Sequence, residues 1–377
     1  MGQIEYDTAV IGAGLMGAST ALFLARSGMR CVLLDRSGVC SEASGVNAGT
    51  LTMQMTRADL IPYAIKGWEM WTNSQEWLGI NPGVVAAPGL SLAFTEEEVA
   101  TLEHRAAARR ERGAQIELLT ASKARSIEPG LSTEVMAASY CPMDGFAKAN
   151  QTGFALSQAL KTARVDIHGA YRVERVEPED DGYAVIGRGE VVRARRLVLA
   201  GGVWLEEMLN WLAVRIPIKT LVNQLAVTER IEPVMRTVIG IASGLLSLKQ
   251  FDNGTVVIGG GWQGKGSRTT GSTQVIPENL IGNVRLAVHA IPNLVHTRLV
   301  RAWCGFEAET ADAMPVIGEV PGINNAFLIG SIHSGYTSGP FMAKLLAQYI
   351  LGHEPELPLF DPRRLIDNES RPKNDVN

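Results

Sequence analysis

Short runs of consecutive apolar residues alternate along the chain with stretches of helical periodicity, and this alternation predicts an α/β protein. The first run, Thr8–Ile11, enters a glycine-rich turn and is followed by an Ala/Leu-rich helical stretch that ends at Gly28. A second run, Arg30–Leu34, ends on the acid Asp35. The order strand, helix and strand predicts a buried βαβ unit at the start of the chain.

Four further segments have the sequence features of helices. One of them begins with Thr-Glu-Glu-Glu and stops at Gly113, which is a cap-to-stop pattern. Its arginine-rich end, Arg105–Arg112, is interpreted as a solvated face. In another, Pro340 precedes the helical run and fits the first position of a helix, which tolerates proline. The four predicted helices are Ala58–Trp77, Thr95–Arg112, Gln151–Ala163 and Phe341–Leu351.

Strand patterns fall in two separate regions of the chain. In the first region a hairpin is followed by the fully apolar run Arg196–Ala200, which leads into Gly201 and Gly202. The second region, from Ile216 to about Val300, predicts a separate sheet, which we assign to substrate. The strands expected in the first region are Tyr171–Glu177, Tyr183–Gly187 and Glu190–Ala194, with a turn at Asp180–Gly182; those in the second are Leu221–Thr228, Gly244–Phe251 and Thr255–Gly260, with a turn at Asp252–Gly254.

Composition narrows the class of protein. A chain of 377 residues predicts two joined domains, and a formal net charge of −4 offers no basic excess for nucleic acid. The cysteines, Cys31, Cys40, Cys141 and Cys304, have no C-x-x-C spacing, so neither a zinc nor an iron–sulfur site is expected. No apolar stretch has the length of a membrane span, and the first strand begins too early for a signal peptide. A cytoplasmic location is therefore expected.

The N-terminal unit carries a dinucleotide-binding pattern, because Gly12, Gly14 and Gly17 have the G-x-G-x-x-G spacing. The first glycine makes the tight turn, the second lets the backbone approach a pyrophosphate, and the third lets the helix pack closely on the strands. The helix N-terminus offers free N–H groups to the phosphates. Asp35 is placed to accept from a ribose 2′-hydroxyl, which disfavours NADP. The alternative is a βαβ unit whose glycines serve packing alone.

Two later segments, Ser41–Thr50 and Leu197–Trp204, are rich in small residues and are expected to bring backbone against a flat ligand. A third segment, Gly330–Pro340, leads into a helix whose positive N-terminal end is expected to point at the electron-accepting ring of the ligand. With the tract Trp303–Gly318 and the N-terminal unit, they resemble the D-amino-acid oxidase superfamily of FAD enzymes, to which glycine oxidase and sarcosine oxidase belong.

The resemblance implies an α/β plus antiparallel β fold. A Rossmann-like FAD-binding domain of the glutathione-reductase type would be interleaved with a strand-rich substrate domain. The implied FAD-binding domain comprises residues 1–82, 140–215 and 301–365, the substrate domain comprises 83–139 and 216–300, and 366–377 would form a flexible tail.

The resemblance also implies where FAD binds, without a covalent bond, because the spacing around Cys304 fits the non-covalent members. The phosphates would lie at Gly12–Gly17, the ring along Ala48–Leu51, and its pyrimidine end under His333–Ser338. The implied cofactor-binding residues are Gly12, Ala13, Gly14, Leu15, Met16, Gly17, Asp35, Arg36, Ser41, Ser44, Gly45, Ala48, Gly49, Thr50, Leu51, Val173, Gly201, Gly202, Trp204, Gly330, His333, Ser334, Gly335, Tyr336, Thr337 and Ser338.

Two positions depart from the glycine oxidase pattern, in which arginines stand at the places of Glu307 and His333. A glutamate and a histidine there resemble the β subunits of multi-subunit amine dehydrogenases. This group includes opine (octopine or nopaline) oxidases, hydroxyproline and proline dehydrogenases, the hydrogen cyanide synthase subunit and heterotetrameric sarcosine oxidase. The phrases Trp303–Glu307 and His333–Pro340 resemble the opine oxidases most.

A β subunit would have partners. The resemblance implies an α subunit, a small iron–sulfur γ subunit, and FMN at an interface between subunits. Residues 148–150 contain no histidine, so any FMN would be held without the covalent bond that a histidine there forms in heterotetrameric sarcosine oxidase.

The implied reaction oxidises a secondary amine or amino-acid derivative, such as an opine, hydroxyproline, proline or sarcosine, by hydride transfer to flavin followed by hydrolysis of the imine. The candidate catalytic residues are Glu307, His333, Tyr336 and Trp262. Glu307 would pair with a cationic amine or guanidinium or act as a base, the alternative being an ion pair with Arg301. His333 would act as acid, base or hydrogen-bond donor, or be satisfied by loop backbone. Tyr336 and Trp262 would form substrate walls or serve ordinary packing.

Three other functions stay open. The chain would be a stand-alone glycine or D-amino-acid oxidase that uses oxygen, or a flavin-bearing subunit that relays electrons while a partner oxidises substrate. An NAD-linked dehydrogenase is the third, and the Gly330–Pro340 tract argues against it.

Overall fold

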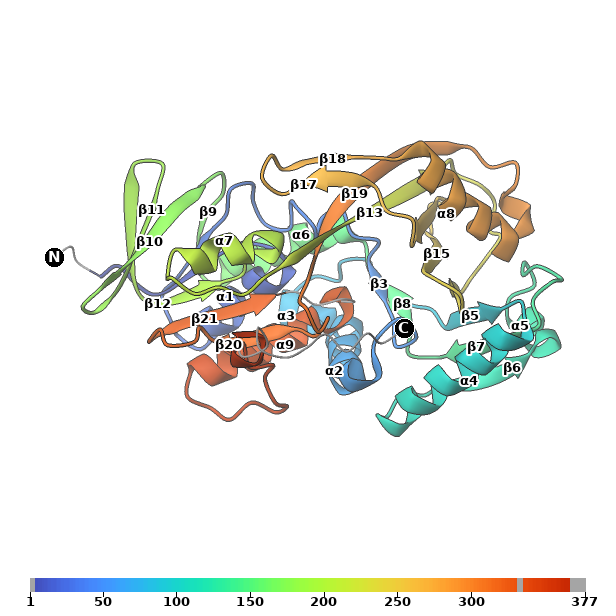
Figure 1. Cartoon of the computed structure of the whole chain (residues 1–377), viewed down its shortest axis with the longest axis horizontal. Helices are drawn as coiled ribbons and strands as arrows, with labels where there is room; N and C mark the ends of the chain where they lie inside the picture. Colours follow the sequence, from blue (N-terminus) through green and yellow to red (C-terminus); the bar gives the residue numbers. More distant parts are fainter. Residues whose placement is uncertain (1–3, 331–334, 367–377) are drawn as a thin grey trace.

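Two large sheets lie along an elongated molecule (Figure 1). The computed structural model describes residues 4–330 and 335–366. Within these residues the first sheet has eight strands in the order β10-β11-β12-β1-β2-β9, with β21 beside β12 and β20 beside β21. The second also has eight, in the order β19-β13-β16-β15-β14-β5-β7-β6.

The first sheet has a parallel centre, since β1 pairs in parallel with β2 and β12, and β21 pairs in parallel with β12. Its strands are buried on both faces, as parallel sheets require. Val10 faces a core shared with helices α1 and α9, and Ile11 faces a second core shared with α7. The elements of this region are β1 (Tyr6–Ile11), α1 (Leu15–Arg26), β2 (Cys31–Leu34), α6 (Ala149–Thr162), β9 (Asp166–His168), β10 (Val173–Glu179), β11 (Gly182–Gly187), β12 (Glu190–Leu199), α7 (Leu205–Asn210), β20 (Val316–Glu319), β21 (Ala326–Gly330) and α9 (Gly335–Ile350).

The second sheet is mostly antiparallel, and its apolar face packs on helix α8. Leu248 and Ile258 of the sheet and Ala287 of α8 are buried in this core. Figure 1 shows α8 on one side of this end of the molecule and α4 on the other. The elements are β5 (Gly89–Ala93), α4 (Glu96–Glu111), β6 (Glu117–Thr120), α5 (Ala121–Ile127), β7 (Ala137–Cys141), β13 (Lys219–Thr228), β14 (Val238–Ile241), β15 (Leu246–Gln250), β16 (Val256–Gly260), α8 (Pro277–Ala290) and β19 (Leu299–Glu309).

Short elements connect the two regions. Strand β8 pairs with both β3 and β4, and β17 pairs with β18. The remaining elements are β3 (Thr50–Leu51), η1 (Ala58–Leu60), α2 (Ile61–Thr72), α3 (Ser74–Leu78), β4 (Val85–Ala86), β8 (Gly145–Phe146), η2 (Gly202–Trp204), β17 (Lys265–Ser267), β18 (Ser272–Gln274), η3 (Pro292–Leu294) and α10 (Arg363–Ile366).

Several predicted elements have different limits in the structure. The predicted helix Ala58–Trp77 is divided into η1, α2 and α3, with Asn73 outside helical geometry. The two strands predicted over 190–200 form one strand, β12, whose first half pairs with β11 and whose second half pairs with β1. Strand β19 pairs with β13 from Lys219 to Thr228, so the domain boundary proposed at residue 301 falls inside a strand of the second sheet. Both predicted hairpin turns join antiparallel strands.

Helix α9 begins before the predicted position, and Pro340 lies inside it. A proline has no N–H, so it cannot donate to the Tyr336 carbonyl one turn earlier. The indole Nε1 of Trp71 on α2 donates to this carbonyl instead, at 2.8 Å, and the Trp71 ring stacks on the Tyr336 ring with centroids 5.2 Å apart. A tertiary contact therefore replaces the hydrogen bond that the proline cannot make within the helix.

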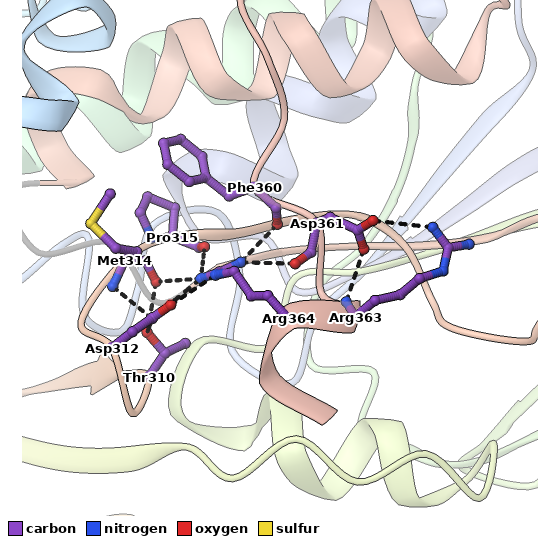
Figure 2. Close-up of polar contacts among 8 residues, drawn as sticks. All are labelled: Thr310, Asp312, Met314, Pro315, Phe360, Asp361, Arg363 and Arg364. Atoms are coloured by element: carbon purple, nitrogen blue, oxygen red, sulfur yellow. Dashed lines mark hydrogen bonds and ion pairs between the residues drawn. The ribbon is translucent and has the colours of Figure 1, made fainter. Parts of the chain in front are cut away.

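The C-terminal segment is fastened to the loop before β20 by Arg364 (Figure 2). Its guanidinium donates to Asp312 Oδ2 at 2.8 Å and to the carbonyls of Met314 and Pro315. Burial opposes ionisation of Asp312, but the Arg364 guanidinium and the Met314 amide together lower its pKa. This loop follows β19 directly, so the contact fixes the connection between the two sheets.

The glycines of the N-terminal unit differ in what surrounds them. Gly12 has a φ of +106°, and a Cβ there would lie 2.3 Å from the Ala200 carbonyl oxygen. A Cβ on Gly17 would lie 2.0 Å from the Gly12 carbonyl oxygen, so these two positions are closed by backbone. A Cβ on Gly14 would meet only the Ser44 Oγ, at 3.4 Å. Gly14 is therefore not required for packing, which fits a position kept bare for a ligand.

We expect Gly14→Ala and Gly17→Ala to fail in different ways. Gly17→Ala should destabilise the apoprotein by about 3 kcal/mol, because the backbone cannot clear the added methyl group. Gly14→Ala should keep the thermal midpoint of the apoprotein and weaken FAD binding about tenfold, the value of one lost backbone contact. Thermal melts of the apoproteins and fluorescence titrations with FAD measure both. Equal loss of stability in the two variants would contradict a ligand-facing role for Gly14.

A double-mutant cycle tests the contact between Trp71 and Tyr336. Trp71→Phe should destabilise the protein by about 1–3 kcal/mol, because the buried carbonyl loses its donor. Pro340→Ala restores a backbone N–H that can donate to the Tyr336 carbonyl within the helix. In the Pro340→Ala background, Trp71→Phe should therefore lower the free energy of unfolding by about 1 kcal/mol less than in the wild type. Urea unfolding of the four proteins gives the coupling. Strictly additive effects would show that the indole donor does not compensate for the proline.

Candidate active site

A cavity of about 720 Å³ separates the N-terminal unit from the second sheet. On one side it is bordered by Gly12, Gly14 and Asp35 of the βαβ unit. On the other side it crosses four neighbouring strands of the second sheet, β19, β13, β16 and β15. We call this space the main cavity. The predicted cofactor residues that border it are Gly12, Gly14, Leu15, Met16, Gly17, Asp35, Arg36, Ser44, Ala48, Thr50, Val173, Gly201, Gly202, Trp204, Gly330, Gly335 and Tyr336.

Seven other predicted cofactor residues are described but do not border the main cavity. Ala13 donates its N–H to Asp35, and Gly45 and Gly49 lie against the carbonyls of Cys40 and Ala147. These residues lie behind those that border the main cavity. The full set is Ala13, Ser41, Gly45, Gly49, Leu51, Thr337 and Ser338. The predicted roles of His333 and Ser334 lie outside the described residues.

Asp35 is held at the cavity wall by backbone. Its Oδ2 accepts from the Ala13 N–H at 2.7 Å, and its Oδ1 accepts from Ser37 and Gly38 at 2.7 and 2.8 Å. A carboxylate has about four acceptor sites, so capacity remains for a ligand hydroxyl. The Leu15 N–H at the start of α1 donates to Ser44 Oγ at 2.9 Å, which fastens the segment after Asp35 to the helix N-terminus.

Arg36 and Trp204 close one side of the main cavity. The Arg36 guanidinium lies 3.7 Å from the centre of the Trp204 ring and is 2.9 Å from the Glu42 carboxylate. All three residues border the cavity. The Trp204 indole also donates to the Arg268 carbonyl at 2.9 Å, which holds the ring in place. Arg36 thus combines a cation–π contact with an ion pair at a position expected to flank the cofactor.

The predicted flavin segment is tied to the start of α9 and to the turn at Asp144. The Thr52 N–H donates to Thr337 Oγ1 at 3.1 Å, and Thr337 in turn donates to the Thr50 carbonyl at 3.4 Å. Asp144 accepts from Met53 N–H at 2.7 Å and from Thr52 Oγ1 at 2.9 Å. The start of α9 and the Asp144 turn therefore set the position of residues 50–53.

A buried lysine lies next to this segment. Lys249 is 0% exposed, and its Nζ donates to Thr50 Oγ1 at 2.5 Å and to Ser247 Oγ at 3.0 Å. Burial lowers the pKa of Lys249 to about 7, so the group exchanges its proton near neutral pH. Thr50 and Ser247 both border the main cavity. Lys249 was not identified as a site residue from the sequence. The sequence does contain a signal for it, because Lys249 is the one cation in a strand whose alternate residues Leu246 and Leu248 face the core.

Glu307 borders the main cavity on β19, and Asn223 of the neighbouring β13 donates to its carboxylate. The alternative partner, Arg301, lies six residues away along the same strand, or about 20 Å. Its guanidinium lies over the Trp303 ring, 5.7 Å from the centre. An ion pair between Arg301 and Glu307 is therefore wrong. Asn223 is a site residue that sequence reasoning missed, because the contact depends on strand pairing.

The two aromatic residues predicted as substrate walls have other surroundings. Tyr336 borders the cavity, but its ring is buried, stacks on Trp71, and donates its hydroxyl to Thr152 at 2.7 Å. Trp262 does not border the cavity, is 44% exposed, and lies over Gly282 of α8. Ordinary packing, the alternative expected for both residues, explains both positions.

The cysteines do not reach the main cavity. None of the four borders it, and Cys304 points toward Gly264. This arrangement supports the expectation of FAD held without a thioether bond. In residues 4–330 and 335–366 there is no cluster of three or more His, Cys, Asp or Glu side chains suited to a metal ion. The same residues contain no helix that is long and apolar enough to span a membrane.

The residues present fit FAD. The bare Gly14 backbone, the α1 N-terminus and the Asp35 carboxylate would hold its dinucleotide part, and the 48–52 segment would border its ring. The main cavity continues from these groups to the strands of the second sheet, so one space borders both the cofactor segments and the sheet assigned to substrate.

Comparisons with known proteins show the family of the chain. Residues 7–349 match the family model DAO, described as FAD dependent oxidoreductase. The chain is 29% identical to the B subunit of opine oxidase from Rhizobium meliloti over 96% of this chain and 98% of that protein, and 25% identical to glycine oxidase of Geobacillus kaustophilus over 92% and 93%.

The solved structures include L-proline dehydrogenase from P. horikoshii, which matches with a TM-score of 0.89 and 22% identity over 98% of this chain and 100% of that chain. This likeness confirms the fold. The chain belongs to the DAO family of FAD-dependent oxidoreductases, which act on CH–NH bonds in their amine- and amino-acid-oxidising members.

Proposed function

We propose that this chain is the catalytic FAD subunit of a hetero-oligomeric dehydrogenase or oxidase that acts on an opine or a related secondary amine. The observation that carries the proposal is Glu307, an acid held by Asn223 at the wall of the main cavity. The similarity to the B subunit of opine oxidase along nearly the full length of both chains supports it.

The charge of Glu307 suits a cationic substrate arm. Octopine and nopaline contain a guanidinium group, which pairs well with a carboxylate through parallel hydrogen bonds. Asn223 donates to the Glu307 carboxylate and orients it at the cavity wall. A glycine or sarcosine substrate has no group that would use this acid beyond its amine.

The chemistry divides between the cofactor and the chain. When bound, FAD supplies a two-electron acceptor for the C–H bond next to the amine nitrogen, and water hydrolyses the resulting imine. The protein binds and orients the amine against the 48–52 segment. Lys249 donates to the hydroxyls of Thr50 and Ser247, so its ammonium group lies next to that segment and would be the nearby proton donor. His333 stays a candidate acid, base or donor, as proposed from the sequence.

The quaternary structure is also proposed. The opine oxidase relative is by name one subunit of a larger enzyme, which favours an α subunit and a small iron–sulfur γ subunit as partners, with FMN at an interface. The four unpaired cysteines fit the reducing cytoplasm as the location.

Two alternatives differ in what the isolated chain does. A stand-alone glycine or D-amino-acid oxidase is favoured by the similarity to glycine oxidase, and it would consume oxygen with glycine. An electron-relay subunit would leave its flavin oxidised in the presence of every amine until a partner is added.

Anaerobic titration of the FAD-loaded chain tests these functions together. Octopine, nopaline, hydroxyproline, proline, sarcosine and glycine are added separately, and flavin absorbance near its visible maximum is followed. We expect the opines to bleach the flavin at the lowest concentration. Bleaching by sarcosine or glycine alone would overturn the opine assignment, and no bleaching by any amine would favour the relay function.

Glu307→Gln is the matched variant for this titration. The amide keeps the shape of the side chain but removes the charge, so the concentration of octopine needed for half-bleaching should rise about tenfold or more. The value for hydroxyproline, which has no guanidinium, should change little. An equal rise in the half-bleaching concentration of both compounds would show that Glu307 does not bind the guanidinium arm.

A further inference from the structure

A second cavity, of about 400 Å³, continues the line of the main cavity along the second sheet. Both cavities are bordered by Met55, Leu245 and Leu246. The main cavity crosses β19, β13, β16 and β15, and the second cavity goes on across β14 and β5, the next two strands. Because neighbouring strands are about 4.8 Å apart, the second cavity extends the space by about 10 Å.

Three arginines border the second cavity, which we call the arginine cavity: Arg57, Arg105 and Arg109. Arg105 and Arg109 are four residues apart on α4, so they share one face of the helix. The solvated face expected from the sequence is confirmed for Arg105, Arg110 and Arg112, which are exposed, while Arg109 is partly buried. Arg110 donates to the Ile116 carbonyl and does not border the arginine cavity. Like charges at this spacing repel one another, so an anion bound between them would stabilise the pair.

Backbone carbonyls position the two guanidinium groups. Arg105 donates from Nη1 to the Ala242 carbonyl at 2.7 Å, and Arg109 donates from Nε to the Thr56 carbonyl at 2.8 Å. Among the described residues neither guanidinium has a carboxylate within 4.0 Å. A guanidinium has five N–H donors, so most remain available to a ligand. Burial, and then the neighbouring Arg105, lower the pKa of Arg109 to about 10.

The arginine cavity also contains a buried donor without a partner. Gln54 is 9% exposed, its Oε1 accepts from Ser139, and its Nε2 has no hydrogen-bond partner among the described residues. An unpaired buried amide is unfavourable unless a ligand satisfies it. Asp144 is the one carboxylate on the cavity lining among the described residues; Met53 and Thr52 donate to it, and its charge also acts on Arg109. The available donors therefore outnumber the acceptors.

We propose that the arginine cavity binds a carboxylate of the substrate, so that the enzyme selects secondary amines with a carboxylate on each arm. The inference rests on the proposed function, because the substrate must reach from the main cavity past Met55 and Leu246. Glu307 lies at the β19 end of the combined space and the arginines lie at the β14–β5 end. A molecule with a cationic arm and a distal carboxylate matches this polarity. A small monocarboxylate such as sarcosine leaves the arginines unpaired.

Two pairs of compounds isolate the second carboxylate. Iminodiacetate differs from sarcosine, and octopine from N2-ethyl-L-arginine, by one carboxylate in place of a hydrogen. In the FAD-loaded wild-type chain we expect the carboxylate to lower the concentration for half-bleaching about tenfold or more, as a charge-assisted contact provides. Arg105→Met and Arg109→Met should each remove most of that preference, because both compounds of a pair then lack the contact that distinguishes them. Arg105→Lys should keep part of it.

Arg110→Met is the matched control, since it removes an arginine of the same helix that does not border the cavity. Should Arg109→Met fail to fold, the exposed Arg105 decides the question alone. If amines bleach the flavin and both variants keep the wild-type preference, the arginine cavity is not the carboxylate site, while the proposed function stands.

A binding measurement separates the two proposals. The thermal midpoint of each FAD-loaded protein is measured with and without iminodiacetate and octopine. If no amine bleaches the flavin but the compounds raise the midpoint of the wild type and not of Arg105→Met, the proposed function fails and the anion site stands. If they raise the midpoints of wild type and Arg105→Met equally, or of neither, the anion site is overturned.

Discussion

The hydrogen bond from the Thr52 amide to the Thr337 hydroxyl joins segments that are 285 residues apart in the chain. Through it the segment expected beside the flavin ring is fixed to the start of α9, which packs in the core of the first sheet. The same segment reaches the second sheet through the contact of Thr50 Oγ1 with Ser247 Oγ at 2.7 Å. Residues 50–52 are therefore the point at which the cofactor-binding region, the second sheet and the C-terminal helix meet.

The second sheet gives the substrate region its direction. Its strand order places an acid, Glu307, at one end of the combined cavities and two arginines at the other. The relative placement of these charges follows from strand pairing and from the packing of α4 on β5 and β7. Such an arrangement would distinguish substrates by the charged groups at the two ends of the substrate molecule, because the reacting C–H and N–H groups are the same in all amine substrates. We therefore propose that selectivity resides in the interleaved sheet, while FAD would supply the oxidising power.

The sequence predicts the parts whose physics is local. The glycine spacing, the apolar runs and the acid at Asp35 define β1, α1 and β2, and the turn residues define both hairpins. Helix α9 shows the limit of such local prediction. A proline at position 340 indicates the start of a helix, and only the tertiary contact of Trp71 with the Tyr336 carbonyl explains why the helix begins earlier. The surroundings of Tyr336 and Trp262 show the same limit. Their neighbours come from distant segments, and no local pattern tells a buried or cavity-facing position from a solvated one.

A crystal structure of the FAD complex tests the central claim most directly, namely that the main cavity holds FAD with its ring between residues 48–52 and the second sheet. We predict the diphosphate at the N-terminus of α1, the ring against Thr50 and Ser247, and no bond to Cys304. A ring bound away from Thr50, or a thioether bond to Cys304, would contradict this claim.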